Sequence, residues 1–416
     1  MLNICCGRRD LLVIVVGRMV STFGDGVALV ALMLRLQADG AAPYEVALVL
    51  AAGSIPLLLL ARPVGRLVDT YDSRRLLLAG GLVQVAVTIP LIFLHAVLPI
   101  VVLVAVLAGV SSLTGATWSA LLPRVVGEEH VAEAVSAQTS LNVLALVAAP
   151  AVGGLLAGAF GSGVPIALDA ATFGVLTIAA ALVRTRRVPE RRHTAEAVGG
   201  GLAILRADRI LAPLLTGVAV VVLLVGMVDV VTVYLVRDTL HAGGVWYGVT
   251  EASWMAGMVA GAVAAGLART ESRQIHATIG GAALACAGVA CFALAPTAAV
   301  LVPLAIVGGF GNGYAGTCLS TLLVTRTPDS ARGRISATAN AIFGGAAGAS
   351  LLVGGAVAVA LSPREIYATA GLLGLAAAAL MGVRYAAHRE RTGDVEARVA
   401  TPPVGTGSGV DLGRTA

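Results

Sequence analysis

The chain has 416 residues, of which 58% are hydrophobic and only 12% are charged. Its mean hydropathy of +0.92 reflects more apolar surface than a soluble domain of this size could bury in one core, which excludes a soluble enzyme or binding module. The net charge of +5 comes with 28 basic residues, all of them Arg, in short segments between apolar stretches. This distribution indicates orientation in a membrane and argues against nucleic-acid binding.

A transmembrane helix needs about 20 mostly apolar residues to cross the hydrocarbon layer. Twelve such stretches follow one another along the chain. They cover residues 11–35, 45–64, 76–95, 98–121, 134–158, 163–183, 210–234, 246–268, 276–295, 298–323, 335–359 and 366–384. The sequence therefore predicts an all-α membrane protein of about twelve transmembrane helices.

The two halves of the chain resemble each other when the sequence is shifted by about 200 residues. The shift aligns Gly80 with Gly280 and Thr117 with Thr317 without a gap. Such a repeat predicts two pseudo-symmetric six-helix bundles. We expect an N-terminal bundle at 1–183, a cytoplasmic linker at 184–209, a C-terminal bundle at 210–387 and a disordered cytoplasmic tail at 388–416.

Arg residues are concentrated in the connections on one side of the predicted spans. Because cytoplasmic connections carry an excess of basic residues, both termini are expected in the cytoplasm. The use of Arg alone, without Lys, is typical of high-GC bacterial coding sequences. We therefore expect a multi-pass protein of the bacterial cytoplasmic membrane, in contact with lipid and monomeric.

A short polar motif follows the second predicted span. Its residues are Gly65, Asp69, Arg74 and Arg75. In spacing and residue type this motif resembles the signature loop of the major facilitator superfamily. Thr70 replaces the usual basic residue, and Asp72 stands where many members have Gly, a departure common in the drug:proton antiporter branch that includes macrolide and enterobactin exporters.

Two further segments are similar to that branch. Pro150, Gly153 and Gly154 resemble its antiporter motif in the fifth helix, and Arg332 with Arg334 resembles a segment before the eleventh helix. The resemblance implies the two-bundle fold and transport by alternating access. It also implies that the signature-loop residues, with Arg332 and Arg334, form a conformational latch.

Each motif also has a purely structural interpretation. The signature-loop charges could act only as topology determinants in solvated connections. The glycines after Pro150 could serve ordinary helix packing rather than a functional bend in the helix.

Ionisable side chains inside predicted spans are the strongest functional candidates, because each costs about 2.5–3.5 kcal/mol at the bilayer centre unless it faces a cavity or a partner. The candidates are Asp25, Arg18, Asp229, Glu251 and Asp169. Asp25 is the first choice for taking up a proton from one side and releasing it to the other. Asp169 and Glu251 could instead face interfacial water, and Asp229 could form a structural ion pair near Arg237, while Arg18 could bind a lipid phosphate or neutralise an acid.

These features predict a secondary transporter that exports a hydrophobic or amphipathic small molecule, such as a drug, a siderophore or a secondary metabolite, and uses a proton gradient rather than a cofactor. A proton-coupled uptake symporter and a non-transporting sensor or scaffold with the same fold remain alternatives. The chain has no Walker motif, no His or Cys spacing typical of a metal site, and no catalytic constellation, so no enzyme activity is expected.

Overall fold

The computed structural model describes residues 2–183, 203, 205, 208 and 210–400. The elements of the first part of the chain are α1 (Leu2–Ala38), α2 (Pro43–Leu59), α3 (Ala61–Thr70), α4 (Ser73–Leu91), α5 (Val97–Val126), η1 (Glu128–His130), α6 (Val131–Phe160) and α7 (Gly163–Leu182). The elements of the second part are α9 (Leu211–Gly226), η2 (Met227–Val230), α10 (Thr232–Tyr234), η3 (Leu235–Thr239), α11 (Gly244–Ala264), η4 (Ala265–Leu267), α12 (Glu271–Phe292), α13 (Ala298–Thr325), α14 (Asp329–Val357) and α15 (Pro363–Ala400). Every regular element in these described residues is helical, as expected.

Ten of the described helices are long and apolar enough to cross a membrane. Helices α2 and α3 pass the same test only as a pair that is bent by 47° at Leu60, which gives up to eleven spans. Helix α11 has 21 residues but is not among the ten, because Glu251, Tyr247 and the Trp residues lower its hydropathy. The exact number of twelve spans is therefore not confirmed by length and composition.

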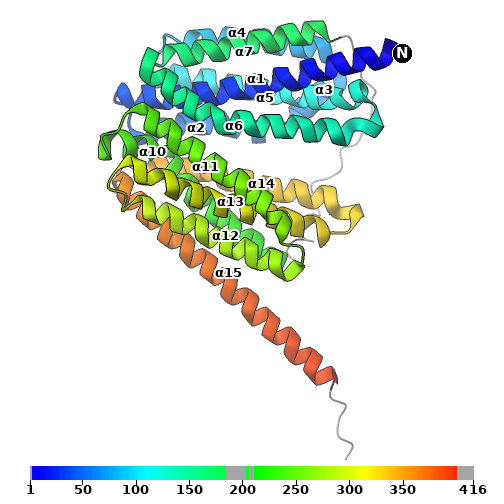
Figure 1. Cartoon of the computed structure of the whole chain (residues 1–416), viewed down its shortest axis with the longest axis vertical. Coiled ribbons are helices and arrows are strands. Elements are labelled where there is room, and N and C mark those ends of the chain that lie inside the picture. Colours follow the sequence, from blue (N-terminus) through cyan, green and yellow to red (C-terminus); the bar gives the residue numbers. More distant parts are fainter. Residues whose placement is uncertain (1, 184–202, 204, 206–207, 209, 401–416) are drawn as a thin grey trace, which may run out of the picture.

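Helices pack mainly with others from the same part of the chain. In Figure 1, α1 to α7 occupy the upper part of the view and α9 to α15 the lower part. Helix α1 packs along α6 and α7, and α13 packs along α11 and α12. The helices that begin at Ser73, Val97, Val131 and Gly163 are each followed by another about 200 residues later, which is the shift that the sequence repeat predicts.

Polar groups fix several helix ends. The Asp72 side chain accepts hydrogen bonds from the backbone N–H groups of Arg74 and Arg75, at 3.0 and 3.2 Å, and so caps α4. Such a cap satisfies N–H groups that have no partner within the helix. Helix α6 ends at Gly161, whose φ of 79° favours glycine.

Buried Arg35 ties three helices together at the far end of α1. Its guanidinium donates to the carbonyl oxygen of Leu91, the last residue of α4, at 2.5 Å, and to that of Leu94, just after α4, at 3.2 Å. It also donates to Ser162 Oγ at 2.8 Å, just before α7. A cation near the C-terminal end of a helix interacts favourably with the helix dipole.

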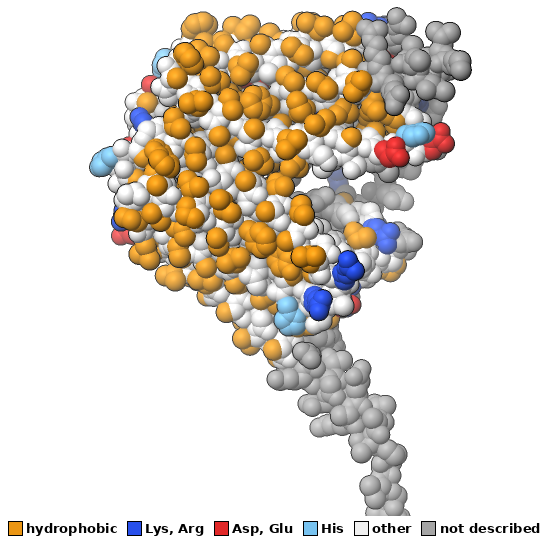
Figure 2. All heavy atoms as spheres, viewed as in Figure 1, with side chains coloured by type: hydrophobic (Ala, Val, Ile, Leu, Met, Phe, Trp, Pro, Cys, Tyr) orange, Lys and Arg blue, Asp and Glu red, His pale blue; other side chains and the backbone are white. Residues whose placement is uncertain are grey.

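The two parts of the chain contact each other through α2 with α14 and α6 with α11. Polar contacts join them at the end that carries Arg35, which we call the closed end. There the Tyr234 hydroxyl donates to the Ala41 carbonyl at 2.5 Å, Gln37 Nε2 donates to Asp238 Oδ1 at 2.7 Å, and Arg237 Nε donates to Gln37 Oε1 at 3.2 Å. Figure 2 shows a hollow between the upper and lower parts on the opposite side, where α1 begins.

Both ends of the described chain lie on that side in Figure 1, where the N label and the red end of α15 are on the right of the view. Helix α15 continues to Ala400, so the first residues of the predicted tail, which begins at 388, are helical and extend the last span. The rest of that tail, 401–416, and most of the predicted linker at 184–209 lie outside the described residues.

Candidate transport cavity and its acidic residues

A cavity of about 600 Å³ lies between the two parts of the chain. Most of its lining comes from α9, η2, α11, α12, α13 and α14, with Leu29 and Met33 of α1 and Leu50 and Ser54 of α2 on the other side. Pockets of roughly 300–1,000 Å³ hold most of the surface of a drug-sized ligand. The cavity is therefore large enough for such a molecule, and its walls are mostly apolar.

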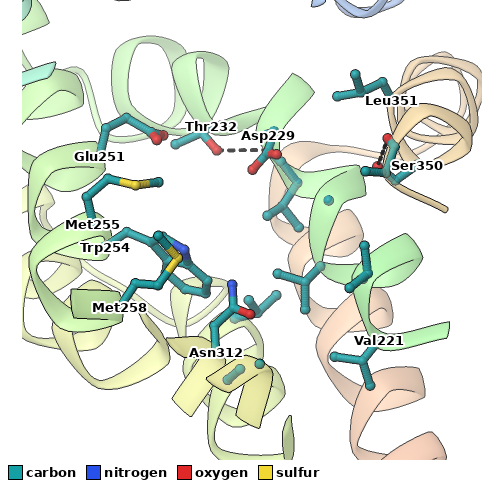
Figure 3. A pocket seen from close by; sticks show the side chains of 18 of the residues that line it. Val221, Asp229, Thr232, Glu251, Trp254, Met255, Met258, Asn312, Ser350 and Leu351 are labelled. Atoms are coloured by element: carbon teal, nitrogen blue, oxygen red, sulfur yellow. Dashed lines mark hydrogen bonds between the residues drawn. The ribbon is translucent and has the colours of Figure 1, made fainter. Parts of the chain in front are cut away.

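Two acids predicted from the sequence, Asp229 and Glu251, both line this cavity. Figure 3 shows them pointing into it from opposite walls. The buried side chains of Tyr247 and Tyr367 line the same cavity. Among the lining residues, all of them in the described part of the chain, Asp229 and Glu251 are the only charged ones.

The helical break at η2 explains the position of Asp229. A 3₁₀ segment, Met227–Val230, interrupts the seventh predicted span, and Asp229 is exposed there while Val228 and Val230 are buried. Irregular backbone at membrane depth is tolerated where it lines a cavity. The possible ion pair with Arg237 is not formed, because Arg237 binds Gln37 instead.

Sequence reasoning missed several other side chains of the cavity. Trp254, Met255 and Met258 line it together with Glu251, and Asn312 approaches from α13 (Figure 3). Their spacing of three, four and seven residues from Glu251 places them on one face of α11. This spacing around an intramembrane acid was a signal that could have identified them.

The cavity ends toward the closed end in an aromatic and hydroxyl cluster. Tyr367 stacks on Phe292 with 5.1 Å between the ring centroids, and its hydroxyl lies 2.8 Å from Thr232 Oγ1. Tyr367 and Thr232 are both buried. Thr232 lies two residues before Tyr234, whose hydroxyl reaches Ala41 at the closed end.

The other two predicted acids, Asp25 and Asp169, form a second pair between α1 and α7. Asp169 is 2% exposed and packs against Gly24, where a Cβ atom would lie 2.7 Å from Asp169 Oδ1. The charges of Asp25 and Asp169 interact, and Thr172 Oγ1 lies 3.3 Å from Asp169 Oδ1. The alternative that Asp169 faces interfacial water is therefore wrong.

Asp25 differs from Asp169 in its exposure. Its side chain is exposed although it lies deep within the fold, one helical turn from the cavity residue Leu29. The structure does not pair it with Arg18, which donates instead to the Gly115 carbonyl, at 3.2 Å, and to Ser119 Oγ, at 3.3 Å, both on α5.

The segment with Pro150 lies where α6 meets α1 and α11. A Cβ atom at Gly153 would lie 2.8 Å from the Val27 carbonyl oxygen of α1, and one at Gly154 would lie 3.0 Å from Gly248 Cα of α11. Both glycines thus allow close helix contact. A functional bend at Pro150 stays a prediction.

The predicted latch residues are spread over several contacts. Arg74 donates to the Ala181 carbonyl of α7 at 2.6 Å, and Arg332 approaches the Val324 carbonyl of α13 at 3.5 Å. Gly65 has open space where a Cβ atom would be. The Asp69 residue is not free of partners within the protein. Arg75 and Arg334 are exposed, and the latch role of the six residues stays a prediction.

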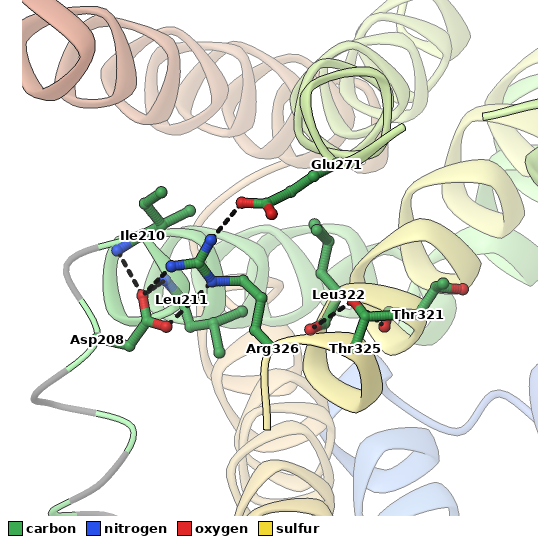
Figure 4. Close-up of polar contacts among 8 residues, drawn as sticks. All are labelled: Asp208, Ile210, Leu211, Glu271, Thr321, Leu322, Thr325 and Arg326. Atoms are coloured by element: carbon green, nitrogen blue, oxygen red, sulfur yellow. Dashed lines mark hydrogen bonds and ion pairs between the residues drawn. The ribbon is translucent and has the colours of Figure 1, made fainter. Parts of the chain in front are cut away.

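Sequence reasoning also missed a charge cluster at the end of the molecule opposite the closed end. Arg326, just after α13, binds Asp208 Oδ2 through Nε at 3.1 Å and also pairs with Glu271 at the start of α12 (Figure 4). Burial alone would raise the pKa of Asp208, but hydrogen bonds from the Leu211 and Ile210 backbone and from Arg326 together hold it below its usual value. The cluster therefore joins α9, α12 and α13 through ionised groups.

No group of three or more His, Cys, Asp or Glu residues arranged to hold a metal ion occurs in the described parts of the chain. The acids that we singled out within the spans form two pairs instead, Asp25 with Asp169 and Asp229 with Glu251. They are the groups in these spans that could bind a proton or a cation.

Solved structures of transport proteins share this fold. The crystal structure of the nucleoside transporter NupG superposes with a TM-score of 0.70 at 11% identity, covering 90% of this chain and 99% of that one. A bacterial homologue of the iron transporter ferroportin, in an inward-facing state, gives a TM-score of 0.67 at 16% identity, covering 91% and 98%. The helical architecture is therefore that of a multi-pass membrane transporter.

The family follows from the sequence. The model of the Major Facilitator Superfamily matches residues 14–351, and the chain belongs to this superfamily. Macrolide efflux protein A of Streptococcus pyogenes is 22% identical over 270 residues, which are 62% of this chain and 66% of that protein. The uncharacterized transporter YfiS of Bacillus subtilis (strain 168) is 22% identical over 281 residues, 66% of this chain and 67% of that protein.

Proposed function

We propose that this protein exports a hydrophobic or amphipathic small molecule across the bacterial cytoplasmic membrane in exchange for protons. The observation that carries the proposal is a mostly apolar cavity between the two parts of the chain, with acids at membrane depth beside it. The similarity to macrolide efflux protein A supports export, although this chain covers 66% of that protein's length.

The proposed architecture has twelve spans in two pseudo-symmetric bundles. It counts the ten long helices, the bent pair of α2 and α3, and α11. The helices that recur after about 200 residues support a duplication of six spans. Arg-rich connections at the end where α1 begins support a cytoplasmic location for that end and for both termini.

Alternating access would proceed from an inward-open state. Contacts of Gln37 and Tyr234 hold the closed end together, and a hollow lies at the opposite side. Opening the closed end requires separation of α6 from α11 and of α2 from α14, which meet through small residues that let the helices approach closely.

The proton carrier in this proposal is Asp25 with Asp169. Two neighbouring carboxylates at membrane depth repel each other when both are charged, so binding of a proton to one of them is favoured. Exposure of Asp25 gives water a route to the pair. When the protein changes from the inward-open to the outward-open state, the pair would carry its proton across the membrane.

Two assays test this function. Cells that express the protein should accumulate less of a substrate, found by screening amphipathic compounds, than cells that lack it. Everted membrane vesicles with an imposed pH gradient should take up the same compound only when their interior is acidic. Uptake driven by the opposite gradient would instead indicate a symporter, and the absence of transport under both gradients would contradict the proposal.

A further inference from the structure

We propose that Asp229 and Glu251 form the binding site for the positive charge of a lipophilic organic cation, so that the exported substrate carries a permanent or protonated cationic group. This inference rests on the proposed export function and adds the charge class of the substrate. It assigns substrate binding to the acid pair of the second part of the chain and leaves proton transport to Asp25 and Asp169.

The charge of the cavity is the first argument. Asp229 and Glu251 face the same space from opposite walls, and none of the other lining residues, all in the described part of the chain, is basic or acidic. Carboxylates in a largely apolar environment are stabilised by a counter-charge. Since the cavity walls provide none, a cation that enters between the two acids supplies it.

The remaining side chains suit the body of such a cation. Trp254 packs against Gly308 of α13 and lines the cavity on the same helix face as Glu251. An indole ring attracts cations through its π face. Met255 and Met258 are flexible and polarisable, so they adapt to apolar groups of different shapes.

Two hydroxyl groups that line the cavity are already hydrogen-bonded within the protein. The Thr232 hydroxyl lies 2.8 Å from the Val228 carbonyl and from the Tyr367 hydroxyl, and Ser350 Oγ donates to the Ala347 carbonyl at 2.6 Å. These hydroxyls are satisfied by the protein. The carboxylates of Asp229 and Glu251 therefore provide the charge-specific interactions of the cavity.

The pair of Asp25 and Asp169 lacks a cavity of this kind. Asp169 is packed between Gly24 and Thr172, with no room for a ligand beside it. Neither Asp25 nor Asp169 lines the cavity. The cavity that can hold a bulky cation therefore lies beside Asp229 and Glu251, and Asp169 has no such space.

The test uses two ions of nearly equal size and opposite charge. Equilibrium binding of tetraphenylphosphonium and of tetraphenylborate is measured on the full chain in lipid nanodiscs, by isothermal titration. Tetraphenylphosphonium is expected to bind at least about tenfold more tightly than tetraphenylborate. Equal affinity for the two ions would overturn the proposal, and this comparison needs no variant.

Variants then locate the site. Asp229→Asn and Glu251→Gln are each expected to weaken tetraphenylphosphonium binding about tenfold, and the double variant more than either. The matched control, Glu133→Gln, removes a negative charge at the exposed start of α6, outside the cavity, and should bind like the unmodified protein. Thermal unfolding of each variant shows that it is folded, and a folded double variant that still binds normally would overturn the proposal.

Failure of this inference is distinguishable from failure of the proposed function. Proton-driven export of a neutral compound without tetraphenylphosphonium binding would refute the cation site and leave export standing. Binding of tetraphenylphosphonium that depends on Asp229 and Glu251, without any proton-driven transport, would support the cation site and refute export.

Discussion

The two acid pairs of this protein occupy different surroundings although both lie at membrane depth. Asp25 and Asp169 lie between packed helices, with Asp169 against a glycine and a threonine, whereas Asp229 and Glu251 face a cavity with a Trp and two Met residues beside them. A packed acid pair has room for a proton, and an acid pair in a cavity has room for a larger cation. In our proposal, Asp25 and Asp169 carry the proton, and Asp229 and Glu251 bind the substrate.

The largest expected effect comes from removing Asp25, the exposed acid of the pair that it forms with Asp169. Asp25→Asn should lower proton-driven transport about 100-fold, because Asp169 then loses the exposed acidic neighbour through which, in our proposal, protons reach the pair. Transport in proteoliposomes with an imposed pH gradient measures this. Asp25→Glu keeps an ionisable group and should retain transport, and normal transport by Asp25→Asn would contradict the role of the pair.

The next effect concerns the contact of α6 with α11, which must separate when the closed end opens. A methyl group at Gly154 would lie 2.9 Å from the Gly244 carbonyl oxygen and 3.0 Å from Gly248 Cα. Gly154→Ala should therefore destabilise the closed end by about 1–3 kcal/mol. Ala42 follows Ala41 at the closed end, so a cysteine introduced there by Ala42→Cys, in a background without native cysteines, reports opening of that end. Labelling of this cysteine should become faster in Gly154→Ala.

A matched glycine provides the control for that experiment. Gly174 of α7 has open space where a Cβ atom would be. Gly174→Ala should leave the labelling rate unchanged. Unchanged labelling of both alanine variants would show that the contact of α6 with α11 does not hold the closed end.

A smaller effect is expected in the charge cluster that supports the second part of the chain. Asp208→Asn removes the carboxylate between Arg326 and the start of α9 and should lower stability by about 1.5–3 kcal/mol at neutral pH. The pKa of Asp208 is below its ordinary value of 3.8 in the folded protein. Its contribution is therefore complete above about pH 4 and is lost as the pH falls through the lowered pKa.

Thermal unfolding at neutral pH and near pH 3 tests this dependence. The difference between the unmodified protein and Asp208→Asn should shrink at the lower pH, because the carboxylate of the unmodified protein begins to take up a proton. The change should leave the pair of Asp25 and Asp169, which lies in the other part of the chain, unaffected. A difference that grows at low pH would reverse the sign of the argument.

The smallest effect is expected at Gln37, which connects the two parts of the chain at the closed end. Gln37→Ala removes one bond to Asp238 and one from Arg237, and should favour opening of the closed end by about 1 kcal/mol. The same cysteine-labelling rate reports this shift. Slower labelling than in the unmodified protein would contradict the role of Gln37.

Much of the fold was predictable because lipid imposes long apolar helices on the sequence. The apolar stretches, their recurrence after about 200 residues and the family motifs could all be identified in the residue pattern. The exact span count was not confirmed, because Leu60 marks a bend and Glu251 lowers the hydropathy of α11. The end of α15 was also misplaced, since charged residues beyond the membrane continue the helix to Ala400.

The site was predictable only in part. Each acid at membrane depth is conspicuous in the sequence, but which acids form pairs depends on helix packing that a single chain position does not reveal. Arg18 illustrates this limit, since it lies two turns from Asp25 on the same helix and yet binds α5. Asp208 and Arg326 are 118 positions apart, and sequence spacing gave no indication of their contact.

One experiment tests the separation of the two pairs most directly. Tetraphenylphosphonium binding and its transport under a pH gradient, with the membrane potential clamped to zero, are measured in the same proteoliposome preparations. Asp25→Asn should bind the cation normally but fail to transport it uphill, whereas the double variant Asp229→Asn with Glu251→Gln should lose both. Loss of binding in Asp25→Asn, or uphill transport by the double variant, would contradict the account.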